Sequence, residues 1–111
     1  MKVAIVGSRE LRLTDFSPYL PADTTEIVSG GARGIDRCAA AYARQNGLKL
    51  TEYLPDYESF GRSAPLRRNV EIVAYADLVL VFWDGQSSGS RFVIDQCKKA
   101  GKPHRVFVAK K

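Results

Sequence analysis

The sequence predicts an α/β fold, a Rossmann-like three-layer sandwich with a mainly parallel five-stranded sheet, in one domain over residues 1–111. Three observations support this prediction. Five short apolar segments of strand length follow one another along the chain. Segments with helical periodicity stand between them. The most apolar segments are hydrophobic at nearly every position, which is typical of parallel strands covered by helices on both faces.

The first four of the five predicted strands are followed by glycine, proline or aspartate residues, which favour turns. They occupy residues 2–6, 25–29, 49–54, 78–83 and 105–108. The fourth, Leu-Val-Leu-Val-Phe-Trp, is the most hydrophobic. Parallel strands of this kind need crossover connections, so we expect right-handed βαβ units.

The predicted helices follow from apolar residues at helical spacing. They occupy residues 35–46, 66–75 and 89–100, with a short first helix at residues 15–20. The longest irregular segment is predicted at residues 55–65, and such a loop in a compact domain is usually functional or mobile.

Composition excludes several classes of protein. Hydrophobic residues make up 45% of the chain and charged residues 26%, which is typical of a folded globular domain. Cys38 and Cys97 are too few for a disulfide scaffold and are interpreted as small buried hydrophobic residues. With the single histidine, His104, they offer too few ligands for zinc, so we expect no metal site and no cofactor.

The net charge of +5 favours an anionic partner, either a nucleotide or nucleic acid. Basic residues gather near the C-terminus, namely Lys98, Lys99, Lys102, Arg105, Lys110 and Lys111. No apolar segment is long enough to span a membrane, and the N-terminus lacks the pattern of a signal peptide. We therefore expect a cytoplasmic protein without a membrane partner.

Three of the predicted strand-to-helix loops are rich in glycine and serine. Gly-Ser-Arg follows the first strand, Ser-Gly-Gly-Ala-Arg-Gly the second, and Asp-Gly-Gln-Ser-Ser-Gly-Ser the fourth. Ligands of parallel sheets bind outside the carboxyl ends of the strands. Glycine lets the backbone approach an anion closely, and a helix N-terminus supplies free N–H groups with partial positive charge. These loops therefore predict a phosphate-binding pocket, although none matches a dinucleotide fingerprint or a P-loop.

A second group of residues, Gly-Arg-Ser-Ala-Pro-Leu-Arg-Arg-Asn at residues 61–69, brings arginines to the start of a predicted helix. Arginine suits bidentate phosphate recognition. Trp83, Tyr57 and Phe60 are candidates for a base-stacking wall, and a core or interface role for Trp83 remains open. The predicted ligand-binding residues are Gly7, Ser8, Arg9, Ser29, Gly30, Gly31, Arg33, Gly34, Arg68, Asn69, Asp84, Ser88, Gly89 and Ser90.

The segment Ser-Gly-Gly-Ala-Arg-Gly-Ile-Asp at residues 29–36 resembles the signature of the DNA-processing protein DprA/Smf. Arg68-Asn69 and Ser88-Gly89-Ser90 are similar to that family's Arg-Asn and Ser-Gly-Ser elements. The same frame resembles the LOG phosphoribohydrolases, and together these families form the SLOG (SMF/DprA–LOG) superfamily. The chain as a whole looks most like the compact YspA-like branch.

The resemblance implies a Rossmann-like fold, a nucleotide or nucleotide-derived ligand, and a homodimer. It places Gly30, Gly31 and Arg33 in a phosphate cradle with the Ser-Gly-Ser element. Arg68 matches the arginine that precedes the last loop of the LOG pattern.

One departure bears on catalysis. The glutamate of the LOG pattern falls on Val93, and a glycosidic-bond hydrolase needs a carboxylate near the anomeric carbon. Asp84, Asp36 or Glu10 are the available substitutes, and Arg68 and Asp84 are the candidate catalytic residues.

The leading hypothesis is therefore a sensor or processing module that binds a nucleotide-derived ligand. The alternatives are cleavage of a nucleoside monophosphate N-glycosidic bond and DprA-like binding of single-stranded DNA.

Overall fold

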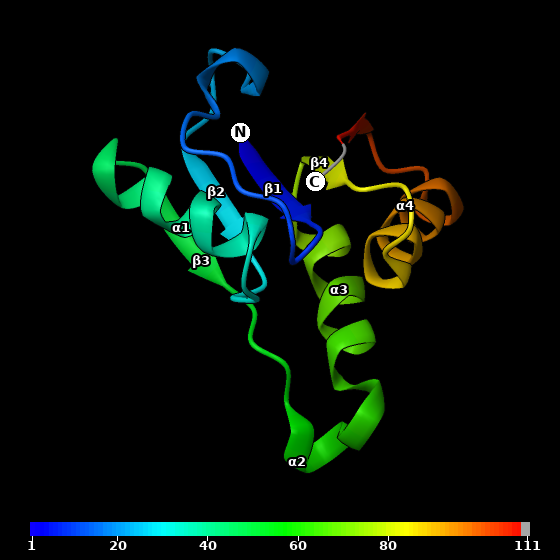
Figure 1. The fold of residues 1–111 in the computed structure, drawn as a ribbon. Helices are drawn as coiled ribbons and strands as arrows, with labels where there is room; N and C mark the ends of the chain where they lie inside the picture. Colours follow the sequence, from blue (N-terminus) through cyan, green and yellow to red (C-terminus); the bar gives the residue numbers. More distant parts are fainter. Residues whose placement is uncertain (110–111) are drawn as a thin grey trace.

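The computed structural model describes residues 1–109, and their five strands form one parallel sheet in the order β3-β2-β1-β4-β5 (Figure 1). The strands are β1 (Lys2–Gly7), β2 (Glu26–Ser29), β3 (Lys49–Glu52), β4 (Leu78–Trp83) and β5 (His104–Val108). Every pairing is parallel, which confirms the predicted Rossmann-like α/β fold. The direction of strand addition changes between β1 and β4, so the switch point of the sheet lies there. Two residues of the predicted basic C-terminal group, Lys110 and Lys111, lie outside the described residues.

Helices cover both faces of the sheet, so the molecule has three layers. Helix α1 (Ile35–Gln45) packs on one face, and α3 (Ala64–Tyr75) and α4 (Ser88–Ala100) pack on the other. Side chains of β1 alternate between the layers because strand periodicity is two: Val3 and Ile5 belong to the first core cluster, and their neighbours in sequence belong to the second. Burial of these aliphatic side chains contributes about 1.5–3 kcal/mol each, so the central strands anchor the loops that follow them.

The predicted first helix at residues 15–20 is wrong, because only the 3-10 turn η1 (Ser17–Tyr19) forms there. Pro21 explains the early stop: a residue that precedes proline avoids helical dihedral angles, and Leu20 is extended at φ −90°, ψ 135°. The segment is held instead by Phe16, which is fully buried.

The predicted irregular segment at residues 55–65 contains regular structure. It includes the one-turn helix α2 (Tyr57–Phe60), the 3-10 turn η2 (Gly61–Ser63) and the first residues of α3. The side chain of Asp56 caps α2, since its Oδ1 accepts a hydrogen bond from the backbone N–H of Ser59 at 3.2 Å. Helix α2 and the start of α3 project beyond the carboxyl ends of the strands (Figure 1). The remaining predicted boundaries agree with the structure to within two residues.

The edge strands differ from the central ones. β1, β2 and β4 are buried almost throughout, whereas β3 and β5 are partly exposed, with Val108 of β5 at 66% exposure. Cys97 is buried, and burial raises the pKa of its thiol to about 11, in keeping with a packing role. Within residues 1–109, no helix is both long enough and apolar enough to cross a membrane.

Candidate functional site

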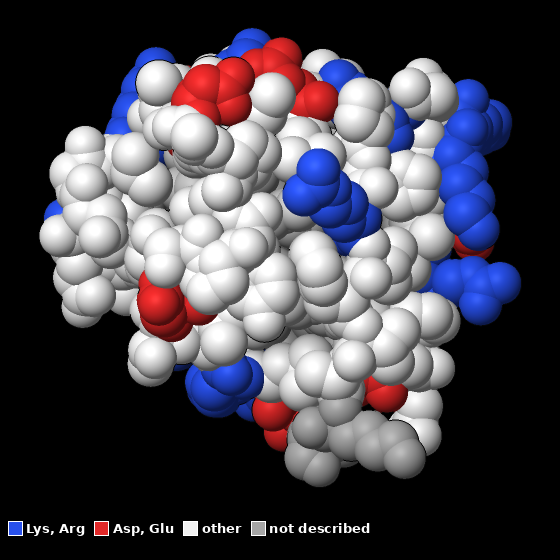
Figure 2. Space-filling model, turned by 90° about the horizontal axis from the view of Figure 1, so that it is seen from above, with Lys and Arg blue, Asp and Glu red and all other residues white. Residues whose placement is uncertain are grey.

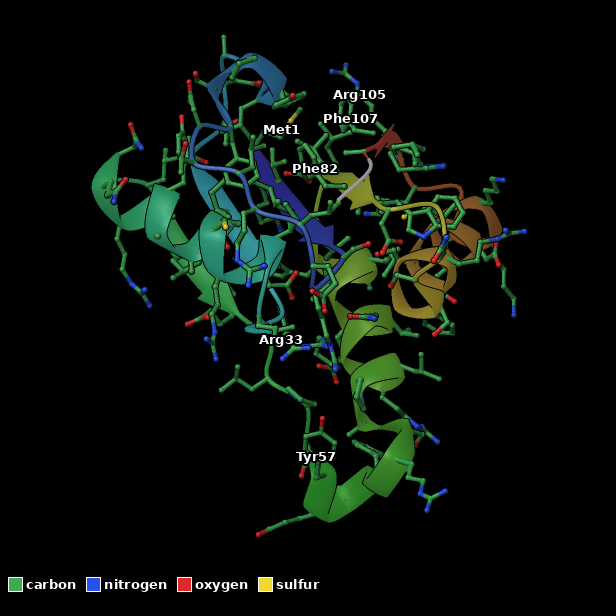
Figure 3. All side chains as sticks on the ribbon, in the orientation of Figure 1. Met1, Arg33, Tyr57, Phe82, Arg105 and Phe107 are labelled. Atoms are coloured by element: carbon green, nitrogen blue, oxygen red, sulfur yellow. The ribbon has the colours of Figure 1, made fainter. Side chains whose placement is uncertain are left out.

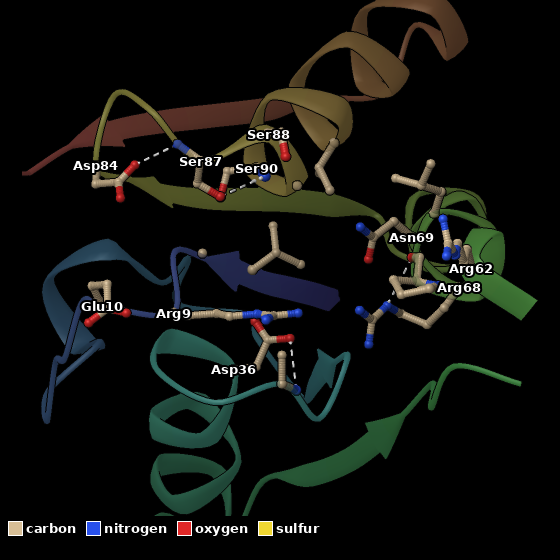
Figure 4. Close-up of a pocket in the computed structure, with 17 residues that line it drawn as sticks. Arg9, Glu10, Asp36, Arg62, Arg68, Asn69, Asp84, Ser87, Ser88 and Ser90 are labelled. Carbon is tan, nitrogen blue, oxygen red and sulfur yellow. Dashed lines mark hydrogen bonds between the residues drawn. The ribbon is translucent and has the colours of Figure 1, made fainter. Parts of the chain in front are cut away.

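A cleft of about 460 Å³ opens where β1 and β4 end, at the switch point of the sheet (Figure 4). Its walls are the first turns of α3 and α4 and the loops after β1, β2 and β4. The structure brings eight of the predicted ligand-binding residues into these walls, namely Gly7, Arg9, Arg68, Asn69, Asp84, Ser88, Gly89 and Ser90.

A second compartment of about 350 Å³ adjoins the cleft. Arg9 and Arg68 line both cavities, and the second compartment adds the predicted residues Gly30, Gly31 and Arg33. The cleft and the second compartment are therefore neighbours at the carboxyl ends of the strands, with Arg9 and Arg68 between them.

Three of the predicted ligand-binding residues are buried beneath these walls and hold the loops in place. The hydroxyl of Ser8 accepts a hydrogen bond from the backbone N–H of Asp84 at 3.1 Å, which joins the loops after β1 and β4. The hydroxyl of Ser29 donates to the carbonyl of Asp36 at 3.0 Å. Gly34 has φ +81°, and an added Cβ would lie 2.5 Å from the carbonyl oxygen of Arg9, so only glycine fits.

The N-terminus of α4 faces the cleft with two open amides. Asp84 holds the turn before it, since its Oδ1 accepts hydrogen bonds from the backbone N–H groups of Gln86 at 2.9 Å and Ser87 at 2.8 Å. Ser87 caps the helix at the amide of Ser90. Within residues 1–109, no acceptor lies in hydrogen-bond range of the amides of Ser88 and Gly89. These two amides are therefore available to an anion, with the helix dipole behind them.

Packing does not explain the glycine at position 89. An added Cβ would meet a single neighbouring heavy atom, the Ser87 Oγ at 4.0 Å, which is ordinary contact. Gly89 is the second residue of α4, and the helix there would accept a larger residue. The lack of a side chain here leaves space at the wall of the cleft for a ligand to approach the helix N-terminus.

Asn69 is the most informative polar residue of the cleft. The residue is 9% exposed, and its side chain points from α3 into the cleft (Figure 4). Within the described part of the chain, its carboxamide has no hydrogen-bond partner. Because no buried side-chain nitrogen or oxygen of the described residues lacks a partner, the unpartnered amide atoms of Asn69 must reach the open space of the cleft.

Arg68 connects the two walls of the region. Its Nη1 donates to the carbonyl oxygen of Gly30, and its Nε donates to the carbonyl of Pro65 at 3.3 Å. Burial lowers the pKa of the guanidinium, against the favourable charge of Asp36, but arginine stays protonated. The remaining nitrogen, Nη2, is free to bind a ligand, and the guanidinium of Arg9 lies close enough to interact with it (Figure 4).

Asp36 supplies the buried carboxylate of the cleft. Burial raises its pKa to about 6, opposed by the backbone N–H of Ala32 and by the charge of Arg68. The Ala32 N–H lies 3.3 Å from its Oδ2. The other two proposed substitutes, Glu10 and Asp84, also line the cleft, and so does Val93, which therefore presents an apolar side chain where the LOG pattern has glutamate.

Sequence reasoning missed Arg37, which lines the second compartment from the first turn of α1. The available signal was its place directly after the glycine-rich loop, since the first turn of such a helix faces the strand ends. Of the proposed aromatic walls, Tyr57 lines the second compartment. Trp83 packs against the core, with its Nε1 donating to the carbonyl of Ser87 at 3.0 Å, and Phe60 lies under Arg67.

Fold and site together define a Rossmann-like α/β protein with a polar, arginine-bearing cleft at its switch point. Residues 1–60 match the family described as the YspA, cpYpsA-related SLOG family. The chain belongs to this family, and membership of the SLOG superfamily points to a nucleotide-related function.

One relative comes from a phage. The chain is 42% identical over 83 residues to the "Gene 61 protein" of Mycobacterium phage D29. The alignment spans 69% of this chain and 66% of that relative, so about a third of the relative lies outside it. The comparison with solved structures gives no match.

Proposed function

We propose that this protein binds a nucleotide or nucleotide-derived ligand in the cleft, as a sensor or processing module, with a phosphate at the N-terminus of α4. The observation that carries the proposal is the carboxamide of Asn69, which has no partner in the described chain although the residue is only 9% exposed. It lines the same cleft as the open amides at the N-terminus of α4. Family membership supports the same ligand class.

The chemistry of the walls suits a phosphate. The amides of Ser88 and Gly89 would donate to phosphate oxygens along the helix axis, where partial positive charge gathers. The hydroxyl of Ser90 adds a donor from the same turn. Arg9 and Arg62 also line the cleft and supply full positive charges.

The cleft volume fits a small ligand rather than a bare ion. Its volume of about 460 Å³ lies within the range of small-molecule sites. The phosphate would occupy one end and leave the rest for sugar and base, with Asn69 able to donate to or accept from a ribose hydroxyl or a base edge.

Gly89→Asp tests the proposal with little risk to the fold. A carboxylate in the first turn of α4 is favourable to the helix by about 0.3–1 kcal/mol, yet it would occupy and repel the phosphate position. Gln96→Glu is the matched control, because it makes the same charge change on α4 outside both cavities. Isothermal titration calorimetry with adenosine and guanosine mono-, di- and triphosphates provides the measurement.

We expect the wild type and Gln96→Glu to bind at least one of these nucleotides, and Gly89→Asp to lose that binding while its melting temperature stays equal or rises. A wild-type protein that binds none of them, or a Gly89→Asp variant that binds as well as the wild type, would contradict the proposal.

A second candidate function is hydrolysis of a nucleoside monophosphate N-glycosidic bond. The observation that favours it is the carboxyl of Asp36, which lines the cleft with a pKa of about 6 and so exchanges protons near neutral pH. Water would add at the sugar C1′ while the base leaves and takes up a proton. Release of free base by the wild type, lost in Asp36→Asn, would support this function. Release of free base no faster than in buffer alone, measured at high protein concentration, would exclude this function.

Binding of single-stranded DNA is the other alternative. On the face in Figure 2, lysine and arginine side chains form a row along the right-hand edge and stand apart from one another elsewhere. Retention of DNA that falls steeply as the salt concentration rises would support this alternative.

The expected homodimer and the cytoplasmic location also stay predictions. Sedimentation velocity would measure the oligomeric state.

A further inference from the structure

The second compartment and the cleft differ sharply in charge. Every charged side chain that lines the second compartment is an arginine, and no aspartate or glutamate of residues 1–109 takes part. The cleft has Arg9, Arg62 and Arg68 against Glu10, Asp36 and Asp84. The arginines of the second compartment are Arg9, Arg33, Arg37 and Arg68. In Figure 3, Tyr57 lies at the end of the molecule away from Met1 and Arg105, and Arg33 lies between them.

Nearby carboxylates balance part of this charge only. Glu10 Oε1 lies 3.5 Å from Arg33 Nη2, and both side chains are more than half exposed, so the pairing is weak. Asp36 acts on Arg68. Within the described chain, Arg9 and Arg37 have no ion-pair partner. Four guanidinium groups around one hollow repel one another, and a bound anion would relieve this repulsion.

The two cavities are contiguous, because Arg9, Ala32, Pro65 and Arg68 line both. The volume of the second compartment, about 350 Å³, is by itself within the range of small-molecule sites. A nucleotide with one phosphate at α4 would leave this compartment and its charge without a partner. A ligand that extends past Arg68 would use both.

We propose that the ligand carries two separated phosphate groups, one held at the N-terminus of α4 and the other by the arginines of the second compartment. The class is a nucleotide phosphorylated at two positions or a dinucleotide. This inference rests on the proposed function and specifies its ligand. Guanidinium groups bind phosphate through paired hydrogen bonds, and Gly30 and Gly31 let the backbone of the second compartment approach the same group.

The test compares probes that differ in the number and spacing of phosphates, at fixed ionic strength. Adenosine 5′-monophosphate is the single-phosphate probe, and ADP carries the added charge on an adjacent phosphate. Adenosine 3′,5′-bisphosphate and cyclic di-AMP carry separated phosphates, and the guanosine counterparts complete the set. Calorimetric titration gives each dissociation constant.

Arg37→Gln is the decisive variant, because Arg37 lines the second compartment and does not line the cleft. Arg44→Gln is its matched control, since Arg44 lies on the same helix, 67% exposed and paired with Glu52 outside both cavities. Gly89→Asp tests the first phosphate position, at the N-terminus of α4.

For the wild type we expect at least one probe with separated phosphates to bind about tenfold or more tightly than the monophosphate, since one charge-assisted contact contributes about that factor. Arg37→Gln should remove most of this gain and keep the monophosphate affinity, while Arg44→Gln should keep both. Gly89→Asp should weaken every nucleotide.

The inference fails if no probe with separated phosphates binds more tightly than the monophosphate, if ADP gains as much, or if Arg37→Gln weakens all probes equally. In each of these cases nucleotide binding itself survives. A wild-type protein that binds no nucleotide at all overturns the proposed function instead.

Discussion

Arg68 of α3 donates a hydrogen bond from Nη1 to the carbonyl oxygen of Gly30, 38 residues earlier in the chain, in the loop after β2. This contact ties the helix wall of the cleft to the glycine-rich loop on the other side. It also fixes one edge of the guanidinium against protein and leaves Nη2 for a ligand.

The close contact between these residues makes Gly30→Ala a probe of binding. An added Cβ would lie 2.6 Å from Arg68 Nη1 and 2.9 Å from Asp36 Oδ2, both at the ends of side chains that can move. We expect the fold to survive and Arg68 to be displaced, so that nucleotide affinity falls about tenfold or more. Calorimetry with the wild-type ligand measures this, and unchanged affinity would show that the position of Arg68 is irrelevant to binding.

Gly34→Ala should instead destabilise the fold. The residue has φ +81°, and its new Cβ would lie within 2.7 Å of backbone atoms of Ser8 and Arg9, which are held by the sheet. We expect a loss of about 3 kcal/mol or more in the free energy of unfolding, measured by urea titration. Gly101→Ala is the control: it shares a positive φ of +66° but meets no atom within 4 Å, so it should lose only about 1 kcal/mol.

Asp36 should make stability depend on pH in the direction opposite to most carboxylates. Its pKa is raised by burial from 3.8 to about 6, so the folded protein holds a proton that the unfolded chain has released between these values. The contribution of Asp36 to the free energy of unfolding is therefore fully present below pH 3.8, and it falls by about 3 kcal/mol as the pH rises to 6.

Asp36→Asn removes this titration and leaves the other groups in place. The difference in unfolding free energy, wild type minus Asp36→Asn, should fall between pH 4 and pH 6 and level off above about pH 6. Urea titrations of both proteins across this range measure it. A difference that rises or stays flat over this range would show that burial does not raise the pKa of the Asp36 carboxyl.

Asn69→Ala separates binding from stability. Within residues 1–109 the carboxamide has no partner to lose, so the free energy of unfolding should change by about 1 kcal/mol at most. Ligand affinity should fall by about three- to tenfold, because the neutral hydrogen bond to the ligand disappears. Equal losses of stability and affinity, measured by urea titration and calorimetry, would assign Asn69 to packing alone.

Much of the fold could be predicted from local signals. The buried strands β1 and β4 consist of apolar runs that end at glycine or aspartate, and their predicted limits agree with the structure within two residues. The predicted helix at residues 15–20 was wrong because Pro21 restricts Leu20, a short-range effect that helical periodicity does not reveal. The turn α2 was missed because a one-turn helix held by the cap of Asp56 has too few residues to show a period.

The sequence by itself determined the parallel α/β fold, the family, and the glycine- and serine-rich loops, because these depend on local composition and on the rule that ligands bind at strand ends. Only the tertiary structure decided how their side chains are used. In the folded chain Asp36 is buried, and Arg68 donates a hydrogen bond to Gly30. Asn69 has no side-chain partner within the described residues, and Arg37 lies with the other arginines of the second compartment. Burial and contact between residues far apart in the chain set these properties, and neither is encoded in the spacing of residue types.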